Sequence, residues 1–154
     1  RQLLDGIPEK RPSKSGKTIQ TYYAFGDERD KLYYAAVHKH HPCTTWTMES
    51  SQNYKWHYKH FYAMGQEFTY RREKSHKTIE LLGKLLSKIP ENIPHGPLTP
   101  FAQAMSHYPM CKVEGDAVKA YRNYYHVAKD FAVWEWKRPA PSWWEGYKGA
   151  SLYS

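Results

Sequence analysis

The most regular spacing of apolar residues lies between residues 42 and 72. Mostly large side chains recur there at steps of three and four residues, which is the repeat of one helix face. The members of this stripe are Trp46, Ser50, Asn53, Tyr54, His57, Phe61, Met64 and Phe68. Pro42 suits a first helical turn, where no backbone N–H is required of it. The pattern predicts one long helix from Pro42 to about Arg72.

Two more segments carry a helical repeat. Residues 76–89 place isoleucine and leucine on one face, and Ser75 stands where an N-cap is needed. Residues 117–136 follow Asp116, a second good N-cap. Their predicted inward stripe consists of Val118, Tyr121, Tyr125, Ala128 and Ala132.

Proline and glycine mark the segments that lack such a repeat. Prolines between residues 90 and 100 predict an irregular connection over residues 92–99, with a short helical piece over residues 101–105. Residues 6–18 are predicted to form an exposed, mobile loop. Residues 19–37 leave two structures open, a short strand over residues 19–25 and a helix over residues 27–37.

These elements predict a mainly α fold, a compact single-domain bundle of three or more helices with long irregular connections. At 154 residues the chain has the length of one domain and can bury a core without disulfides. Residues 137–154 form an aromatic, proline-rich tail, and we expect Trp143 and Trp144 to pack back on the domain or to meet a ligand. The opening Arg1–Leu4 resembles the last turn of a helix, so we expect a native N-terminal segment to precede it.

The chain carries no pattern typical of export or of membrane insertion. It contains neither a long apolar run nor a signal-like opening, and its two cysteines, Cys43 and Cys111, are too few for a disulfide framework. We therefore expect a cytoplasmic protein with no membrane partner.

The net charge of the chain predicts a class of binding partner. Lys and Arg number 23 against 15 Asp and Glu, which gives a net charge of +8. Such an excess attracts polyanions, and aromatic residues at 16% supply rings that can stack on bases. Residues 55–77 hold six basic residues and two glutamates among several of these rings. DNA is the predicted partner.

The predicted nucleic-acid contacts come from two groups of basic residues. The first group consists of Lys55, Lys59, Arg71, Arg72, Lys74 and Lys77. The second group follows the last predicted helix at helical steps and consists of Lys119, Arg122, His126 and Lys129. We expect the two groups to share one exterior patch across which a DNA strand lies.

Three polar residues interrupt the apolar stripe predicted for the long helix from Pro42, and they suggest either a buried network or a pocket. Ser50, Asn53 and His57 would each need a hydrogen-bond partner inside the protein. One interpretation is a satisfied polar network that holds helices in register. The other is a pocket, with Trp46, Ser50, Asn53, His57 and Tyr121 as its lining.

Few residues suit catalysis or metal binding. The candidates for acid–base chemistry are Glu49, Glu67 and His57, although the two glutamates stand about 27 Å apart on one predicted helix and cannot form a pair. Glu67 is also well spaced for an ion pair with Arg71. His38, His40, His41 and Cys43 match no standard zinc spacing, so no metal and no cofactor are predicted.

Several short motifs resemble a family of small phage-encoded proteins. The motifs are His41 to Trp46, Ser50, Asn53 to Trp56, Glu67 to Arg71, His76 to Thr78, Thr99 to Met105 and Ala120 to Tyr125. The resemblance covers residues 41–144. That family is similar, at greater distance, to the phage-type pyrimidine dimer DNA glycosylases, which are helical DNA-repair proteins.

The resemblance implies a glycosylase with lyase activity in the full-length form. An N-terminal amine would attack the sugar, assisted by a glutamate on a first helix, of which only Gln2 to Leu4 would remain here. The function expected from the sequence is a phage-type DNA-binding protein related to base-excision or base-modification enzymes, acting in the host cytoplasm. The alternative is a non-enzymatic module that binds a protein through its aromatic surface and tail.

Overall fold

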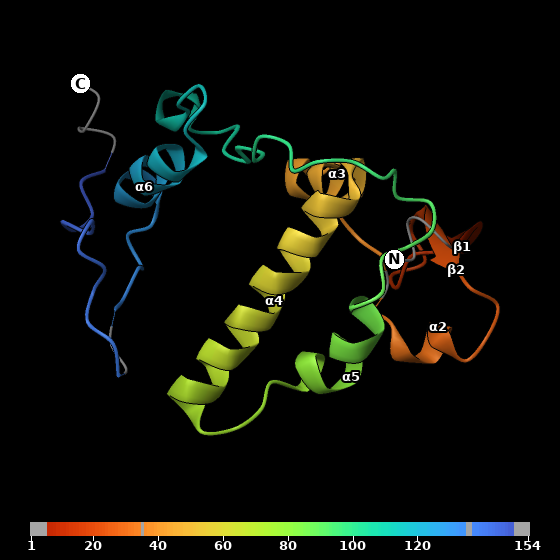
Figure 1. Cartoon of the computed structure of the whole chain (residues 1–154). Helices are drawn as coiled ribbons and strands as arrows, with labels where there is room; N and C mark the ends of the chain where they lie inside the picture. Colours follow the sequence, from red (N-terminus) through yellow and green to blue (C-terminus); the bar gives the residue numbers. More distant parts are fainter. Residues whose placement is uncertain (1–5, 35, 135–136, 150–154) are drawn as a thin grey trace. The chain divides into compact units, whose positions relative to one another are not determined.

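The computed structural model of the chain describes residues 6–34, 36–134 and 137–149 (Figure 1). The chain divides into two compact units, unit 1 with residues 1–99 and unit 2 with residues 100–154. Helices dominate the described residues, as expected, and a small two-stranded sheet accompanies them. The expected single compact bundle is therefore not confirmed.

Unit 1 begins with an antiparallel hairpin of β1 (Ile7–Pro12) and β2 (Ile19–Ala24), in which Ile7 pairs with Ala24. The strand expected after residue 19 is confirmed, whereas the loop expected over residues 6–18 is wrong for β1. The prolines of β1 suggested a loop, yet a strand at a sheet edge tolerates residues without an N–H.

The helix expected over residues 27–37 is reduced to α2 (Arg29–Leu32). None of its residues is buried, and Leu32 is 46% exposed. Without a buried apolar face, a helix this short gains little from packing.

The long helix expected from residue 42 is two helices, α3 (Pro42–Glu49) and α4 (Ser51–Arg72). Ser50 separates them in an extended conformation (φ −151°, ψ 157°) and caps α4 by accepting a hydrogen bond from Asn53 N. The Ser50 hydroxyl donates in turn to Pro97 O (2.7 Å). The break therefore joins α4 to the irregular segment 92–99, which is present as predicted.

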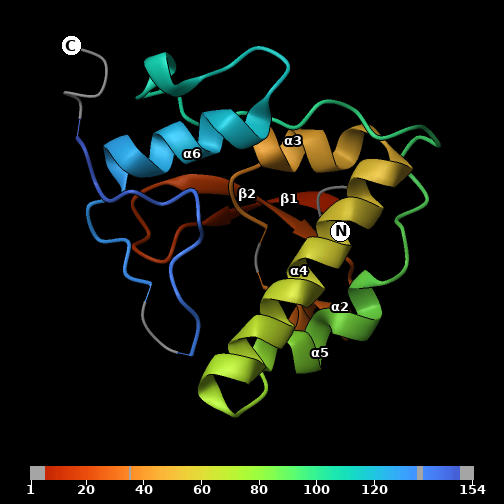
Figure 2. The same cartoon turned by 60° about the vertical axis from the view of Figure 1, so that its left-hand side comes forward.

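The chain reverses after α4, and α5 (Lys77–Leu86) runs back along it (Figures 1 and 2). Ile79 lies at Gly65, and Leu86 O accepts from the Tyr54 hydroxyl (2.9 Å). His76, not Ser75, caps α5. The apolar stripe predicted to face inward is confirmed for most of its residues on α4 but is wrong at Met64, whose side chain is 60% exposed. Gly65 is buried instead, because Ile79 of α5 packs directly on its Cα.

The turn between α4 and α5 contains an unusual backbone conformation. Glu73 ends α4 in the left-handed region (φ 57°, ψ 26°), and its N–H donates to Thr69 O (2.8 Å). Glycine is the common residue at such a position, since a side chain there costs energy.

Unit 2 contains a 3₁₀ turn, η1 (Pro109–Cys111), and α6 (Ala117–Ala128). Asp116 caps α6 as predicted, but α6 ends at Ala128 instead of residue 136, and residues 101–105 form no helix. The core of the unit consists of Met105, Cys111, Ala120 and Val127. The predicted inward stripe is therefore wrong at Val118, which is 58% exposed.

The aromatic tail packs within unit 2, as one of the two expectations had it. Trp144 stacks on His126 at 5.1 Å, and Trp143 meets Tyr125 edge-on at 5.9 Å. Lys148 N donates to His126 O (2.7 Å), which ties the tail to the end of α6.

Candidate nucleic-acid interface and an apolar pocket

One exposed stripe of α4 combines lysines with aromatic and amide side chains. Its members follow at steps of three and four residues and are Lys55, Lys59, Tyr62, Gln66 and Tyr70. All five are exposed, and the two tyrosines retain 45% and 46% of their surface. At 1.5 Å per residue, the stripe runs about 22 Å along the helix.

More basic residues gather where α4 ends and α5 begins. Arg72, Lys74 and Lys77 are exposed there. Cations at the end of α4 suit its helix dipole, but Lys77 begins α5, where the dipole favours an anion. Helix stability therefore does not account for Lys77.

The lysines of the α4 stripe and of the α4–α5 turn stand apart from the ion pairs of unit 1. Within the described part of the chain, Lys55, Lys59, Lys74 and Lys77 have no ion-pair partner. Arg71 differs, because its Nε donates to Glu67 Oε1 (2.7 Å) and both side chains are about one-third exposed. We call the four lysines the lysine surface of unit 1.

The cationic ridge expected on α6 is interrupted. His126 is only 8% exposed, and its Nδ1 lies 2.8 Å from Gly146 O, so it takes no part in a surface. Lys119 and Arg122 are exposed, whereas Lys129 is half-buried with its ammonium 4.9 Å from the Tyr124 ring. The ridge belongs to unit 2, while the lysine surface belongs to unit 1.

Most of the predicted pocket residues form a closed polar network. Asn53 is fully buried, and its Nδ2 donates to Trp46 O (2.8 Å) and Thr99 Oγ1 (2.7 Å). Its Oδ1 accepts from Thr99 N (2.9 Å). Tyr121 lies in unit 2 and donates to Ala102 O (3.0 Å). The network interpretation is thus confirmed for Ser50 and Asn53, whose side chains have internal partners, while the predicted pocket, which also includes Tyr121 of unit 2, stays a prediction.

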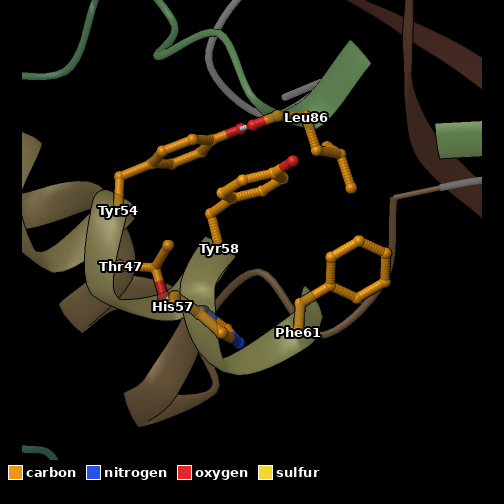
Figure 3. A pocket seen from close by; sticks show the side chains of 6 residues that line it. All are labelled: Thr47, Tyr54, His57, Tyr58, Phe61 and Leu86. Atoms are coloured by element: carbon orange, nitrogen blue, oxygen red, sulfur yellow. Dashed lines mark hydrogen bonds between the residues drawn. The ribbon is translucent and has the colours of Figure 1, made fainter. Parts of the chain in front are cut away.

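A different pocket includes His57 (Figure 3). It lies between α3, α4 and the end of α5 and has a volume of about 230 Å³. The lining residues are Thr47, Tyr54, His57, Tyr58, Phe61 and Leu86. The rings of Tyr54, Tyr58 and Phe61 form one wall, since these residues follow at steps of four and three on α4.

Hydrogen bonds fix the tautomer of His57. The Thr47 hydroxyl donates to Cys43 O (2.7 Å), so its oxygen can only accept from His57 Nδ1 (2.6 Å). The proton of the neutral ring therefore sits on Nδ1, and Nε2 carries a lone pair on the side away from Thr47 (Figure 3). Burial, and to a smaller extent the neighbouring His60, lower the pKa of His57, which keeps the ring neutral at pH 7.

Of the lining residues, only His57 was predicted to line a pocket. Tyr54 and Phe61 were expected on the buried stripe alone, and Thr47, Tyr58 and Leu86 were not singled out. Tyr58 follows Tyr54 by four residues, and this spacing alone could have included it. Thr47 and Leu86 come from other helices, so no local pattern marks them.

The other chemical candidates have structural roles. Glu49 accepts from Thr99 Oγ1 (3.2 Å) and Glu67 binds Arg71, and neither glutamate lines the pocket. His41 Nδ1 accepts from Cys43 N (3.2 Å) and so caps α3. Across residues 6–34, 36–134 and 137–149, no three His, Cys, Asp or Glu side chains come together as a metal site would need. Gln2 to Leu4 lie outside the described residues.

Comparisons with known proteins give no family for this chain. Models of protein families, curated proteins and solved structures each gave no significant match. Within the described residues, no helix has both the length and the apolar character to cross a membrane.

Proposed function

We propose that this protein binds DNA through the lysine surface of unit 1. The observation that carries the proposal is the exposure of Lys55, Lys59, Lys74 and Lys77 without an ion-pair partner among the described residues. Each such lysine can meet a phosphate and release a counterion from the strand. The net charge of +8 would bring the strand to the protein.

The rings beside these lysines favour single-stranded DNA. Tyr62 and Tyr70 share the exposed stripe of α4 with Lys55 and Lys59. A tyrosine ring can stack on an unpaired base, whereas a duplex presents only the edges of its bases in the grooves. We therefore expect tighter binding to a single strand than to the same sequence in a duplex.

Titration of a labelled single strand at two salt concentrations tests this proposal. Four phosphate contacts predict that affinity falls about 50-fold between about 50 and 200 mM salt, since each contact contributes about −0.7 to the slope. Each Lys→Ala substitution in the lysine surface should lower the slope by about that amount.

Lys31→Ala is the matched control, because Lys31 belongs to the same unit but is paired with Glu28 (2.9 Å). This variant should leave the salt slope unchanged. Salt-independent binding, or equal effects of Lys31→Ala and Lys59→Ala, would contradict the proposal.

The base-excision part of the proposal comes from the motif resemblance. In that reaction an N-terminal amine attacks the sugar C1′, and the base leaves with a proton. The C1′–O4′ bond then opens, and its electrons go to O4′, which takes up a proton while C1′ and the amine nitrogen form a Schiff base. Borohydride would reduce the C=N bond and leave a covalent protein–DNA adduct. An adduct between damaged DNA and a form that carries the expected native N-terminus, absent when that amine is acetylated, would support this step. An adduct with residues 1–154 alone would instead indicate a lysine nucleophile.

A further inference from the structure

We propose that the hairpin of β1 and β2 enters the major groove of duplex DNA and binds a guanine next to an adenine there. The hairpin adds little to the core, because no residue of β1 is buried and Ala24 is the only buried residue of β2. Ile7 on one face and Ile19 on the other are 68% and 66% exposed. Both faces of the hairpin are therefore open to a partner.

The dimensions of the hairpin suit this groove. The major groove of B-DNA is about 12 Å wide and admits a two-stranded ribbon, whose strands lie about 4.8 Å apart. Each strand has six residues, so at about 3.3 Å per residue the hairpin is about 20 Å long. This length exceeds the depth of the groove, which is about 8.5 Å.

One face of the hairpin carries two side chains suited to base edges. Arg11 and Gln20 are cross-strand partners, so their side chains point to the same face with Cβ atoms about 5 Å apart. Arginine can bond to O6 and N7 of guanine, and glutamine to N6 and N7 of adenine. Since successive bases lie about 3.4 Å apart, the two side chains fit neighbouring base pairs.

The contacts of Arg11 hold one edge of its guanidinium and leave the other edge available. Nε and Nη2 both donate to Glu9 Oε2, the first at 2.8 Å, and the Tyr22 ring centre lies 5.9 Å from the guanidinium carbon. Nη1 has no hydrogen-bond partner among the described residues. Nη1 and the second hydrogen of Nη2 can therefore meet guanine O6 and N7 together.

Gln20 is held in a similar way. Its Oε1 accepts from the Tyr22 hydroxyl (3.3 Å), and its Nε2 has no partner in the described part of the chain. A carbonyl oxygen has two lone pairs, so Oε1 can also accept from adenine N6 while Nε2 donates to N7.

The loop that joins the strands supplies phosphate contacts. Lys14 and Lys17 are exposed there, and neither has an ion-pair partner within the residues that the structure describes. The loop closes through Ser13 N, which donates to Thr18 O (2.7 Å). Phosphate contacts fix the register of a protein on the duplex, and base contacts then select the sequence.

This inference rests on the proposed function for its partner, DNA, but it concerns a different surface and a different form of DNA. The lysine surface belongs to α4 and the α4–α5 turn, where we expect a single strand. Duplexes that lack the selected bases should still bind more weakly than that strand. Duplex RNA should not be selected by sequence, because its major groove is too deep and narrow for side chains to reach the bases.

Selection from a pool of DNA duplexes with ten randomised base pairs tests this inference on the 154-residue chain. We expect enrichment of a guanine next to an adenine. A duplex with these bases should bind about tenfold more tightly than one in which they are replaced. No binding to the pool, no enrichment, or an equal preference in duplex RNA would overturn the proposal.

Substitutions separate base contacts from phosphate contacts. Arg11→Ala should remove the preference for guanine and Gln20→Ala the preference for adenine, each leaving the other preference in place. Lys14→Ala should instead weaken binding to every duplex equally and lower the salt slope by about 0.9. If Arg11→Ala also acts equally on every duplex, the proposed contact with guanine is wrong.

Arg29→Ala is the matched control for Arg11→Ala. Arg29 belongs to the same unit, is paired with Asp27 (2.7 Å) and lies over the Phe25 ring at 4.1 Å. Its replacement removes the same charge and should leave both base preferences unchanged. Loss of a preference in this variant would overturn the assignment to the hairpin.

The two proposals can fail separately. A chain that binds the labelled single strand but shows no base preference in duplexes would contradict only the role of the hairpin. A chain that selects duplexes through Arg11 and Gln20 but binds no single strand would contradict only the role of the lysine surface.

Discussion

Asn53 replaces backbone hydrogen bonds that the break between α3 and α4 removes. In a continuous helix, Trp46 O would accept from the N–H four residues later. Since Ser50 is extended, Trp46 O accepts from Asn53 Nδ2 instead (2.8 Å). The same amide holds Thr99 through two further hydrogen bonds, so one side chain connects α3, α4 and the segment 92–99.

Replacing Asn53 should therefore destabilise unit 1. Asn53→Ala removes the three hydrogen bonds that the Asn53 amide makes with Trp46 O, Thr99 Oγ1 and Thr99 N, and we expect a loss of about 3 kcal/mol in the free energy of unfolding. Gln52→Ala, its exposed neighbour, should change that energy by less than about 0.5 kcal/mol. Urea denaturation measures both, and equal losses would contradict the role given to Asn53.

The lowered pKa of His57 makes stability depend on pH. The unfolded chain, with an ordinary pKa of 6.5, binds a proton at His57 more readily than the folded chain. Stability should therefore fall as the pH is lowered below about 6.5. His57→Leu should show a weaker dependence between about pH 7.5 and 5.5 than the unchanged chain. Thermal unfolding across this range gives the comparison.

Helical spacing marked the right polar residues in the sequence but not their separate roles. Ser50, Asn53 and His57 were expected to need internal partners, and all three have them. Their partners lie in other segments, with Thr99 following Asn53 by 46 residues. Because helical spacing contains no information on such distant contacts, it could not separate the network from the pocket.

At the scale of the elements, the repeat of apolar residues predicted where the helices lie more accurately than where each helix begins and ends. The stripe stays in phase across Ser50, since Trp46 and Asn53 are seven residues, or about two turns, apart. An interruption of one residue is therefore invisible in the repeat. The missed strand β1 has a different cause, since its pairing partner β2 lies beyond a turn.

Two glycines give opposite predictions for the packing of α5. A Cβ at Gly65 would lie 2.3 Å from Ile79 Cγ1, so Gly65→Ala should cost about 1–3 kcal/mol by pushing α5 away. A Cβ at Gly83 would meet only Ile79 Cγ2 at 3.8 Å, which is ordinary contact. Gly83→Ala should therefore stabilise the chain by up to about 1 kcal/mol, because alanine favours helix.

Urea midpoints of the two alanine variants test this contrast. Ile79→Val removes one methyl group from the crowded position and should recover part of the loss in Gly65→Ala. Destabilisation of similar size at Gly65 and Gly83 would show that close contact with Ile79 does not set the position of α5.

At the scale of the whole molecule, positive charge is divided unevenly between the units. Residues 1–99 contain 16 Lys and Arg against 10 Asp and Glu, a net +6, while residues 100–154 contain 7 against 5, a net +2. Composition therefore indicated the more basic part of the chain. The expected common patch remains a prediction, because its two groups of cations belong to different units.

This division predicts which unit dominates DNA binding. Replacing Lys55, Lys59 and Lys74 by alanine should weaken binding of a single strand far more than replacing Lys119, Arg122 and Lys129, although each variant loses three charges. Circular dichroism should accompany the titrations, since Arg122 and Lys129 also lie over aromatic rings. Equal losses would indicate that both units contact the strand.

The left-handed Glu73 combines two effects at a single position, one on the backbone and one on charge. Glycine would adopt this conformation at about 1 kcal/mol lower cost, and in the sequence Glu73 stands between Arg72 and Lys74. Glu73→Gly would thus relax the turn and at the same time make it one charge more attractive to a polyanion. With glutamate at this position the turn keeps both the less favourable backbone conformation and one negative charge. That charge lowers the attraction of the α4–α5 turn for a polyanion, whatever the sequence of the polyanion.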